Sequence, residues 1–190
     1  MIKDDLQQIL DEHREAAAKS FDSDCLQVLE RITREVLKAL KGEGKVLLCG
    51  NGGSAADSQH IAAEFIARFK QDRRSLPALA LTTDTSILTA VANDYAYDKI
   101  FSRQIEGLGR KGDILFAIST SGNSKNVLQA VQQAKRQEIF TVGFTGEDGG
   151  ELKKRVDLCF QAKSRKTPHI QEIHVTVLHA ISEAVENVLF

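Results

Sequence analysis

Residues 46–64 read Val-Leu-Leu-Cys-Gly-Asn-Gly-Gly-Ser-Ala-Ala-Asp-Ser-Gln-His-Ile-Ala-Ala-Glu. The first four are apolar and predict a buried strand, and the glycines after them predict a tight turn. The remainder predicts a helix that carries His60 and Glu64. A strand that passes through a glycine turn into a helix is typical of parallel α/β folds, and such a turn suits an anionic ligand.

Four further short apolar runs predict strands, at residues 79–82, 114–118, 140–144 and 158–160. The clearer ones are almost continuously apolar rather than alternating, which indicates parallel strands buried on both faces. Segments with the helical period separate most of them. The chain is therefore predicted to form a doubly wound, five-stranded parallel sheet in a flavodoxin-like three-layer sandwich.

Helices are expected at both ends of this sheet-forming region. Apolar residues recur every three or four positions over residues 6–40, with a break near Ser20–Ser23, which predicts two opening helices. Residues 168–190 show one long helical stripe, with Pro168 placed in a first turn. A chain of 190 residues suits one domain. We expect a single domain over 1–190, made of opening helices (1–42) and an α/β core with its closing helix (43–190).

Composition excludes several classes of partner. The formal charge is −1 and no long run of either sign occurs, so no nucleic acid partner is expected. Arg73–Arg74 and Lys153–Arg155 are expected to be solvated faces. No stretch approaches the roughly 20 apolar residues of a membrane span, and the N-terminus has no apolar signal core. Cys25, Cys49 and Cys159 are widely spaced, which favours a cytoplasmic location.

Three predicted strands run directly into turns rich in glycine, serine and threonine. These turns lie at Gly50–Ser54, Ser119–Ser124 and Thr145–Gly150. Ligands of open α/β sheets bind at the carboxyl ends of the strands. The ligand-binding edge of the sheet is therefore predictable.

The second of these turns has the chemistry of a phosphate site. Ser119, Thr120, Ser121 and Ser124 offer four hydroxyls beside the start of a predicted helix, whose free N–H groups attract an anion. A phosphate monoester fits, but the lysine of a nucleotide-binding P-loop is missing. The alternative is that Ser124 merely caps its helix. The turn alone leaves both interpretations open.

The first turn also matches the dinucleotide pattern G-x-G-x-x-A over Gly50–Ala55. Dinucleotide binding requires an acidic residue about 20 positions further on, at the end of the second strand. Here the nearest candidate is Asp84, about thirty positions on. A nicotinamide or flavin cofactor is therefore not expected, and the glycines are expected to bring the backbone close to a ligand.

His60 and Glu64 lie four positions apart, so they share one face of the predicted helix. A metal ion or an acid/base pair suits them, and an ordinary surface contact is the alternative. On the closing helix, Gln171 and His179 differ by about 80° around the axis but by about 12 Å along it. Either only one of them binds a given metal, or two subunits share the site. His13 is expected to be a surface residue.

Together these residues resemble a known family. The matching blocks are Cys49–Ser54, His60–Glu64, Ala92–Asp94, Ile118–Ser124, Thr145–Gly150 and Ile170–His179. They are similar to the sedoheptulose 7-phosphate isomerases, the phosphoheptose isomerases of the sugar isomerase (SIS) fold. The resemblance runs in order over almost the whole chain.

The resemblance implies conversion of the ketose D-sedoheptulose 7-phosphate into D-glycero-D-manno-heptose 7-phosphate, at the head of nucleotide-heptose synthesis for bacterial surface glycans such as lipopolysaccharide. It implies a homotetramer with active sites between subunits, in which the opening helices serve oligomerisation. Glu64 would move the proton between C1 and C2, and His179 would serve the oxygens as an acid. One zinc ion per subunit would be held by His60, Glu64, Gln171 and His179. The substrate would contact Asn51, Gly52, Gly53, Ser54, Asn93, Asp94, Ser119, Thr120, Ser121, Ser124 and Gln171.

Two other functions remain open on the sequence. A related tetrameric adaptor, which associates with the DnaA replication initiator, shares the fold but lacks counterparts of Glu64 and His179. Another SIS phosphosugar isomerase or a sugar-phosphate sensor would keep the turn Ser119–Ser124 with its four hydroxyls, here called the hydroxyl turn. Three departures from the family concern substrate detail and rate. His169 stands where the isomerases usually have arginine, and Ala55–Ala56 stands where some members carry other residues. Thr82–Thr85 resembles the adaptor's version of this stretch more than that of some isomerases.

Overall fold

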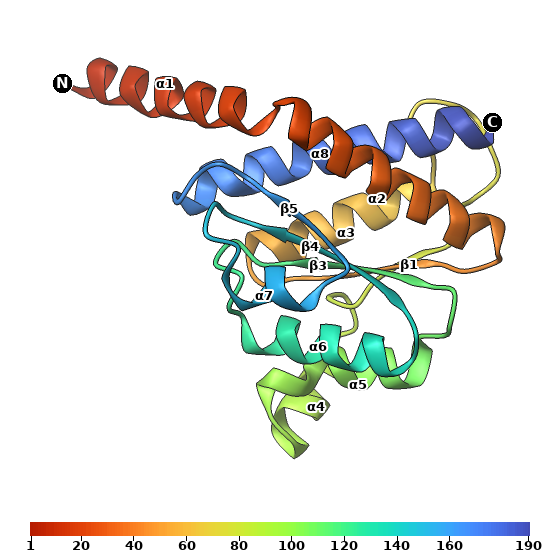
Figure 1. Ribbon diagram of the computed structural model, residues 1–190. Coiled ribbons are helices and arrows are strands. Elements are labelled where there is room, and N and C mark those ends of the chain that lie inside the picture. The colour runs from red at the N-terminus through yellow and green to blue at the C-terminus, as the bar shows by residue number, and fades with distance from the viewer.

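The computed structural model describes residues 1–190 and contains one five-stranded, all-parallel sheet in the order β2-β1-β3-β4-β5 (Figure 1). This confirms the predicted doubly wound sheet. The strands are β1 (Val46–Cys49), β2 (Ala78–Ala80), β3 (Ile114–Ile118), β4 (Phe140–Thr145) and β5 (Leu158–Gln161).

The second strand lies slightly earlier than the expected 79–82. Pairing with β1 begins at Ala78, opposite Val46, and ends at Ala80, opposite Leu48. β2 lies at an edge of the sheet, so only one neighbour fixes its ends. Leu81 still donates its N–H to Leu48 O, and the chain turns away at Thr82.

Eight α-helices accompany the sheet. The break that was expected near Ser20–Ser23 is present, because the Asp22 side chain accepts the Cys25 N–H and starts a second helix. The closing helix has its proline in the first turn, as expected. The helices are α1 (Ile2–Ser20), α2 (Ser23–Lys41), α3 (Gly53–Ile66), α4 (Thr85–Asp94), α5 (Ile100–Leu108), α6 (Lys125–Arg136), α7 (Gly150–Arg155) and α8 (Thr167–Leu189).

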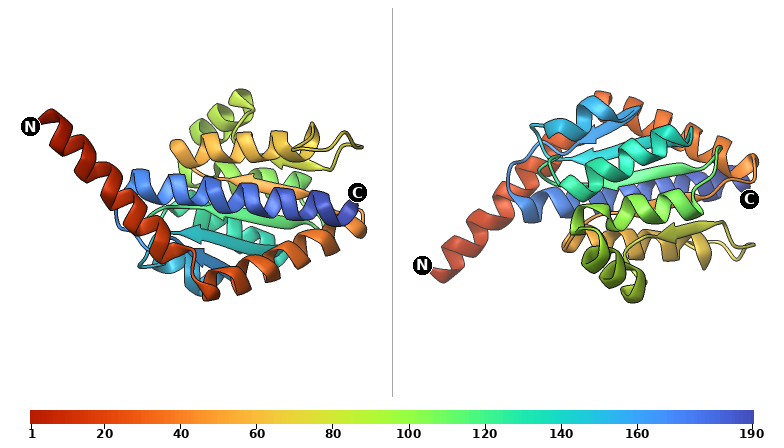
Figure 2. Two further views of the ribbon diagram at one scale, coloured as in Figure 1. Left: turned by 90° about the horizontal axis from the view of Figure 1, so that it is seen from above. Right: turned by 90° about the horizontal axis from the view of Figure 1, so that it is seen from below.

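The helices form a layer on each face of the sheet, which gives the predicted three-layer sandwich (Figures 1 and 2). Val46 and Leu48 pack with α2, α3 and α8, whereas Leu47 and Cys49 pack with α5 and α6. Both faces of the strand are thus fully buried. This explains why its sequence is continuously apolar.

The strand order reverses direction between β1 and β3, since β2 lies outside β1 whereas β4 and β5 lie outside β3. In open α/β sheets, this switch point is where the chain leaves a crevice for ligands. The turns Gly50–Ser54 and Ser119–Ser124 follow these two strands. The topology therefore brings together the two turns with chemical content.

None of the helices combines the length and the apolar character that crossing a membrane requires. All three cysteines are free.

Candidate functional site

The two turns at the switch point are joined by a pair of side-chain amides. Asn51 Nδ2 donates to Asn126 Oδ1 at 2.9 Å, and Asn126 Nδ2 donates back to Asn51 Oδ1 at 2.8 Å. Tyr97 adds a hydroxyl contact to Asn51 Oδ1 at 3.3 Å. Asn126 is buried in the first turn of α6, so Asn51 is held against the start of that helix. Asn126 and Tyr97 were not identified from the sequence, because only the fold brings them to Asn51.

The hydroxyl turn is built around a contact between its two ends. Ser119 Oγ donates to Ser124 Oγ at 3.0 Å. Ser124 is the N-cap residue of α6, yet its side chain makes no capping hydrogen bond. The alternative that Ser124 serves only as a cap is therefore wrong.

A glycine contact fixes the shape of this turn. Gly122 has φ +67°, and a Cβ atom there would lie 2.2 Å from Gly149 O. The turn thus packs directly on Thr145–Gly150. A pocket of about 320 Å³ lies between them and includes Thr120, Ser121 and Asn123 in its lining.

A second group of side chains joins α3 to α8. His60 Nε2 lies 3.1 Å from Glu64 Oε1, and His179 Nε2 lies 3.4 Å from His60 Nε2. One ligand atom from each residue falls within 4.8 Å of the others. The Phe69 ring also lies beside His179, with ring centroids 5.4 Å apart. Two imidazoles and a carboxylate form a donor set that suits a divalent transition metal.

Burial favours the neutral form of one of these histidines. It lowers the pKa of His179, and repulsion by His60 lowers it further, whereas Glu64 acts in the opposite direction. The neutral imidazole has a lone pair for a cation. One turn earlier on α3, burial raises the pKa of Asp57 to about 6, although His60 opposes the shift. Asp57 was not identified as a site residue, although its position three residues before His60 was a usable signal.

The end of α3 that carries Glu64 is held by a buried arginine. Arg73 donates to Glu64 O at 2.8 Å, to Phe65 O at 2.9 Å and to the Glu186 carboxylate at 2.7 Å. Its side chain is only 2% exposed, so the expectation of a solvated face was wrong for Arg73. Helix-terminal carbonyls and a carboxylate compensate its charge, which explains why it can be buried.

Gln171 lies away from the group formed by His60, Glu64 and His179, here called the His60 group. A Cβ atom on Gly53 would meet Gln171 Nε2 at 2.4 Å, which places Gln171 at the first turn of α3. His179, two turns further along α8, instead contacts His60 near the middle of α3. Gln171 makes no hydrogen bond to this group. The separation along the helix that the sequence indicated is therefore present within one chain.

The remaining predicted substrate contacts differ in exposure. Gly52 is exposed with φ +56°, whereas the Ser54 residue is buried beneath the turn. Asn93 and Asp94 are exposed at the end of α4 and hydrogen bond to each other at 2.8 Å. Neither of these two side chains hydrogen bonds to the turn Ser119–Ser124 or to His60, Glu64 and His179.

Two further residues, His13 and Cys49, lie outside this group. His13 was expected at the surface, but it is only partly exposed and lies 2.9 Å from the Glu172 carboxylate. Its side chain remains 31% exposed, because α8 packs beside α1 and covers it only in part. Burial raises the pKa of Cys49 to about 12, so the thiol at the end of β1 stays protonated and unreactive.

Comparison with known proteins identifies close relatives. The sequence profile of the SIS domain matches residues 12–146. A phosphoheptose isomerase of Roseiflexus sp. is 55% identical over 84% of this chain and 81% of its own. Another, from Helicobacter pylori, is 46% identical over 98% of this chain and 96% of its own.

Solved structures agree with these sequence relatives. The phosphoheptose isomerase of Neisseria gonorrhoeae superposes with a TM-score of 0.93 at 37% identity, covering 98% of this chain and 100% of that one. The Francisella tularensis enzyme gives a TM-score of 0.95 at 31% identity, covering 98% and 99%.

Proposed function

The chain belongs to the phosphoheptose isomerases of the SIS-domain family, and we propose that it converts D-sedoheptulose 7-phosphate into D-glycero-D-manno-heptose 7-phosphate. The observation that carries this proposal is the meeting of His60, Glu64 and His179 in one group of side chains on α3 and α8, where α3 is the helix that follows the first glycine turn. The product would feed nucleotide-heptose synthesis for surface glycans such as lipopolysaccharide.

In this proposal the hydroxyl turn binds the phosphate group of the substrate. Ser119, Thr120, Ser121 and Ser124 come directly before α6, and none of their hydroxyls caps that helix, whereas Asn123 of the same turn accepts the Glu151 N–H at the start of α7. Hydroxyl donors together with the positive end of a helix favour a dianion. Gly52, Gly53 and Ser54, with Asn51, Asn93, Asp94 and Gln171, would then contact the sugar.

Glu64 is the proposed base. Its carboxylate removes a proton from C1 of the ketose, which gives an enediol, and returns a proton to C2. His179 moves the proton between the two oxygens, so that O1 becomes the aldehyde oxygen and O2 the hydroxyl. The net change is a shift of two hydrogens, and no external oxidant or reductant is needed.

The donor set at this site fits zinc. His60, Glu64 and His179 supply two nitrogen atoms and one oxygen from a partly exposed group, and Gln171 is the proposed fourth ligand. When bound, one zinc ion per subunit would polarise the sugar oxygens. Because Gln171 and His179 lie two turns apart in one chain, we propose that neighbouring subunits contribute to each site.

The opening helix supports a tetramer. Leu6, Ile9 and Leu10 recur on one face of α1 and are each more than half exposed. Figure 2 shows α1 projecting beyond the helices that cover the sheet. A row of exposed apolar side chains marks an interaction surface, so we propose that residues 1–42 mediate oligomerisation. A cytoplasmic location accords with the three free cysteines.

The adaptor function is not favoured. The chain retains Glu64 and His179, and both lie in one group of side chains with His60. A binding module has no need of a base and a neutral imidazole at this position.

The test is a product assay with purified, zinc-supplied protein and sedoheptulose 7-phosphate. We expect the aldose 7-phosphate to accumulate, as followed by NMR. Absence of aldose, together with tight binding to the DnaA initiator in a pull-down with purified components, would reverse the proposal in favour of the adaptor.

A further inference from the structure

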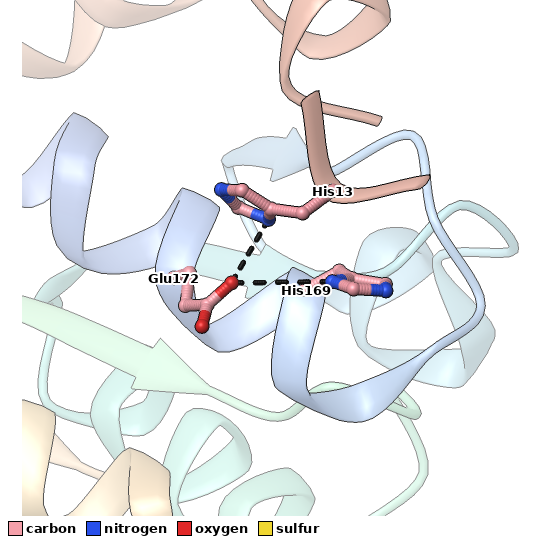
Figure 3. A group of neighbouring side chains, drawn as sticks. All are labelled: His13, His169 and Glu172. Atoms are coloured by element: carbon pink, nitrogen blue, oxygen red, sulfur yellow. Dashed lines mark ion pairs between the residues drawn. The ribbon is translucent and has the colours of Figure 1, made fainter. Parts of the chain in front are cut away.

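A second group of possible metal ligands lies outside the proposed active site, between α1 and the start of α8. His13 comes from α1, whereas His169 and Glu172 come from the first two turns of α8 (Figure 3). His13 Nδ1 lies 2.9 Å from Glu172 Oε2, and His169 Nδ1 lies 3.9 Å from the same oxygen. One ligand atom from each of the three falls within 4.8 Å of the others.

Two nitrogen atoms of this group have no hydrogen-bond partner. Nδ1 of His13 and Nδ1 of His169 are both shielded from solvent, and neither contact with Glu172 has hydrogen-bond geometry. Buried nitrogen atoms without a partner are uncommon, because leaving them unpaired costs about 1–3 kcal/mol. The His169 side chain is only 6% exposed. Two such atoms aimed at one carboxylate therefore require an explanation.

We propose that His13, His169 and Glu172 form a second binding site for a divalent transition metal, distinct from the site at His60. Two imidazoles and one carboxylate are a zinc donor set, and they disfavour magnesium and calcium, which prefer oxygen ligands only. A metal ion would satisfy both unpaired nitrogen atoms at once.

The geometry requires only small side-chain movements. Tetrahedral zinc with bonds of about 2.0 Å places its ligand atoms about 3.3 Å apart. The two contacts at 2.9 and 3.9 Å bracket this separation. The His13 side chain is 31% exposed and that of Glu172 is 59% exposed, so both have room to adjust.

The surroundings of the group complete the site. Glu12 Oε2 faces the other nitrogen of His169, Nε2, at 4.0 Å. The same oxygen accepts a hydrogen bond from Lys166 Nζ, so Glu12 places a carboxylate near Nε2 without hydrogen bonding to it, and Nδ1 is the nitrogen that faces Glu172. A pocket of about 550 Å³ borders His169 and Glu12 and gives access to ions and to water as the fourth ligand.

A metal ion bound here would link α1, which projects beyond the rest of the protein, to the start of α8. His13 lies in the second half of α1, before the chain enters α2, and its two partners lie at the opposite end of the sequence. Binding of a metal to the folded state alone stabilises it in proportion to the logarithm of metal concentration. Occupancy of this site would therefore set the orientation of α1.

The test counts zinc ions in a background that lacks the first site. In the His60→Ala/His179→Ala double variant, we expect about one zinc per chain by mass spectrometry after equilibrium dialysis. Adding His13→Ala should remove it, whereas adding Arg14→Ala, a change at the neighbouring exposed residue, should leave it in place. Cobalt titration of the same proteins should show tetrahedral absorption bands only where His13 is present.

A second comparison protects the test against misfolding of the double variant. Wild-type protein should bind one zinc more per chain than His13→Ala, and circular dichroism should show both folded. Equal zinc content in wild type and His13→Ala, or no zinc in a folded His60→Ala/His179→Ala protein, would overturn the second site. Neither count depends on isomerase activity, so failure of this proposal is distinguishable from failure of the proposed function.

Discussion

The hydroxyl of Ser124 occupies the position of a helix cap but is available for binding a ligand. It accepts from Ser119 and does not cap α6, although it occupies the cap position. Ser119 is almost fully buried, so its hydroxyl positions that of Ser124. The Ser124 hydroxyl donates to no group of the chain, so its proton is available for a hydrogen bond to a ligand phosphate.

We predict that Ser124→Ala raises KM for the sugar phosphate and leaves kcat nearly unchanged. Loss of one hydrogen bond to a charged group costs about 1.5–3 kcal/mol, or about 10- to 150-fold in affinity. A contact made equally in ground and transition states appears in KM alone. Steady-state kinetics would measure the change, with Ser86→Ala, an exposed serine on α4, as the control. An unchanged KM would place the phosphate elsewhere.

At the scale of elements, the end of α3 is joined to α8 outside the candidate site by the buried ion pair of Arg73 with Glu186, called the lock below. The Glu186 carboxylate accepts N–H groups of Phe69, Lys70 and Gln71 and pairs with Arg73, which in turn holds the last carbonyls of α3. The lock fixes the helix that carries Glu64 against the helix that carries His179. These two residues belong to different ends of the chain, so their relative position depends on such contacts.

We predict that Glu186→Gln lowers the free energy of unfolding by about 3–5 kcal/mol, because removing one charge leaves Arg73 buried and unpaired. Glu183→Gln is the matched control: Glu183 lies on the same helix, pairs with Lys70 and is 39% exposed. An exposed pair contributes about 0–1 kcal/mol. Urea unfolding would measure both variants, and equal effects would contradict the lock.

The same carboxylate predicts a pH dependence of stability. Burial raises the pKa of Glu186, but the three backbone N–H groups and Arg73 outweigh it and hold the pKa below its usual 4.5. A lowered folded-state pKa gives stability that is complete above the unfolded value and is lost as pH falls through the folded value. The stability difference between wild type and Glu186→Gln should therefore be constant near neutral pH and shrink below about pH 4.5. A difference that grows on acidification would contradict this assignment.

The elements were largely predictable, and their mutual contacts were not. Short apolar runs identified all five strands, and the clearer runs are continuous because both faces of the sheet are buried. Only the edge strand β2 was shifted. The hydroxyl turn and the pair His60 and Glu64 could be identified from local spacing. Asn126 and the buried state of Arg73 depend on residues distant in sequence, which local patterns do not encode.

At the scale of the molecule, the exposed row on α1 is the feature that one chain does not explain. Leu6, Ile9 and Leu10 are each more than half exposed, and the helix projects beyond the rest of the protein (Figure 2). Gln171 lies apart from the group that it is proposed to complete. Assembly would answer both features, since a neighbouring subunit can cover the row and supply a ligand.

We predict that Leu6→Glu dissociates the tetramer, because a charge buried in an apolar interface is strongly unfavourable. Gln8→Glu introduces the same charge on the opposite face of α1 and should leave the tetramer intact. Light scattering coupled to size-exclusion chromatography would report the mass of each variant. A monomeric wild type, or a tetrameric Leu6→Glu, would contradict the role of α1. Activity should fall together with mass if subunits share the site.

The most direct test of the proposed chemistry concerns Glu64. In deuterated water, NMR should show wild-type protein converting sedoheptulose 7-phosphate into the aldose, with deuterium entering at the carbon that receives the proton. Glu64→Gln should lose at least about 100-fold in kcat, the usual size of general base catalysis. Gln59→Ala, an exposed change on the same helix, should keep the wild-type rate. No aldose from wild type, or equal rates for wild type and Glu64→Gln, would contradict Glu64 as the base.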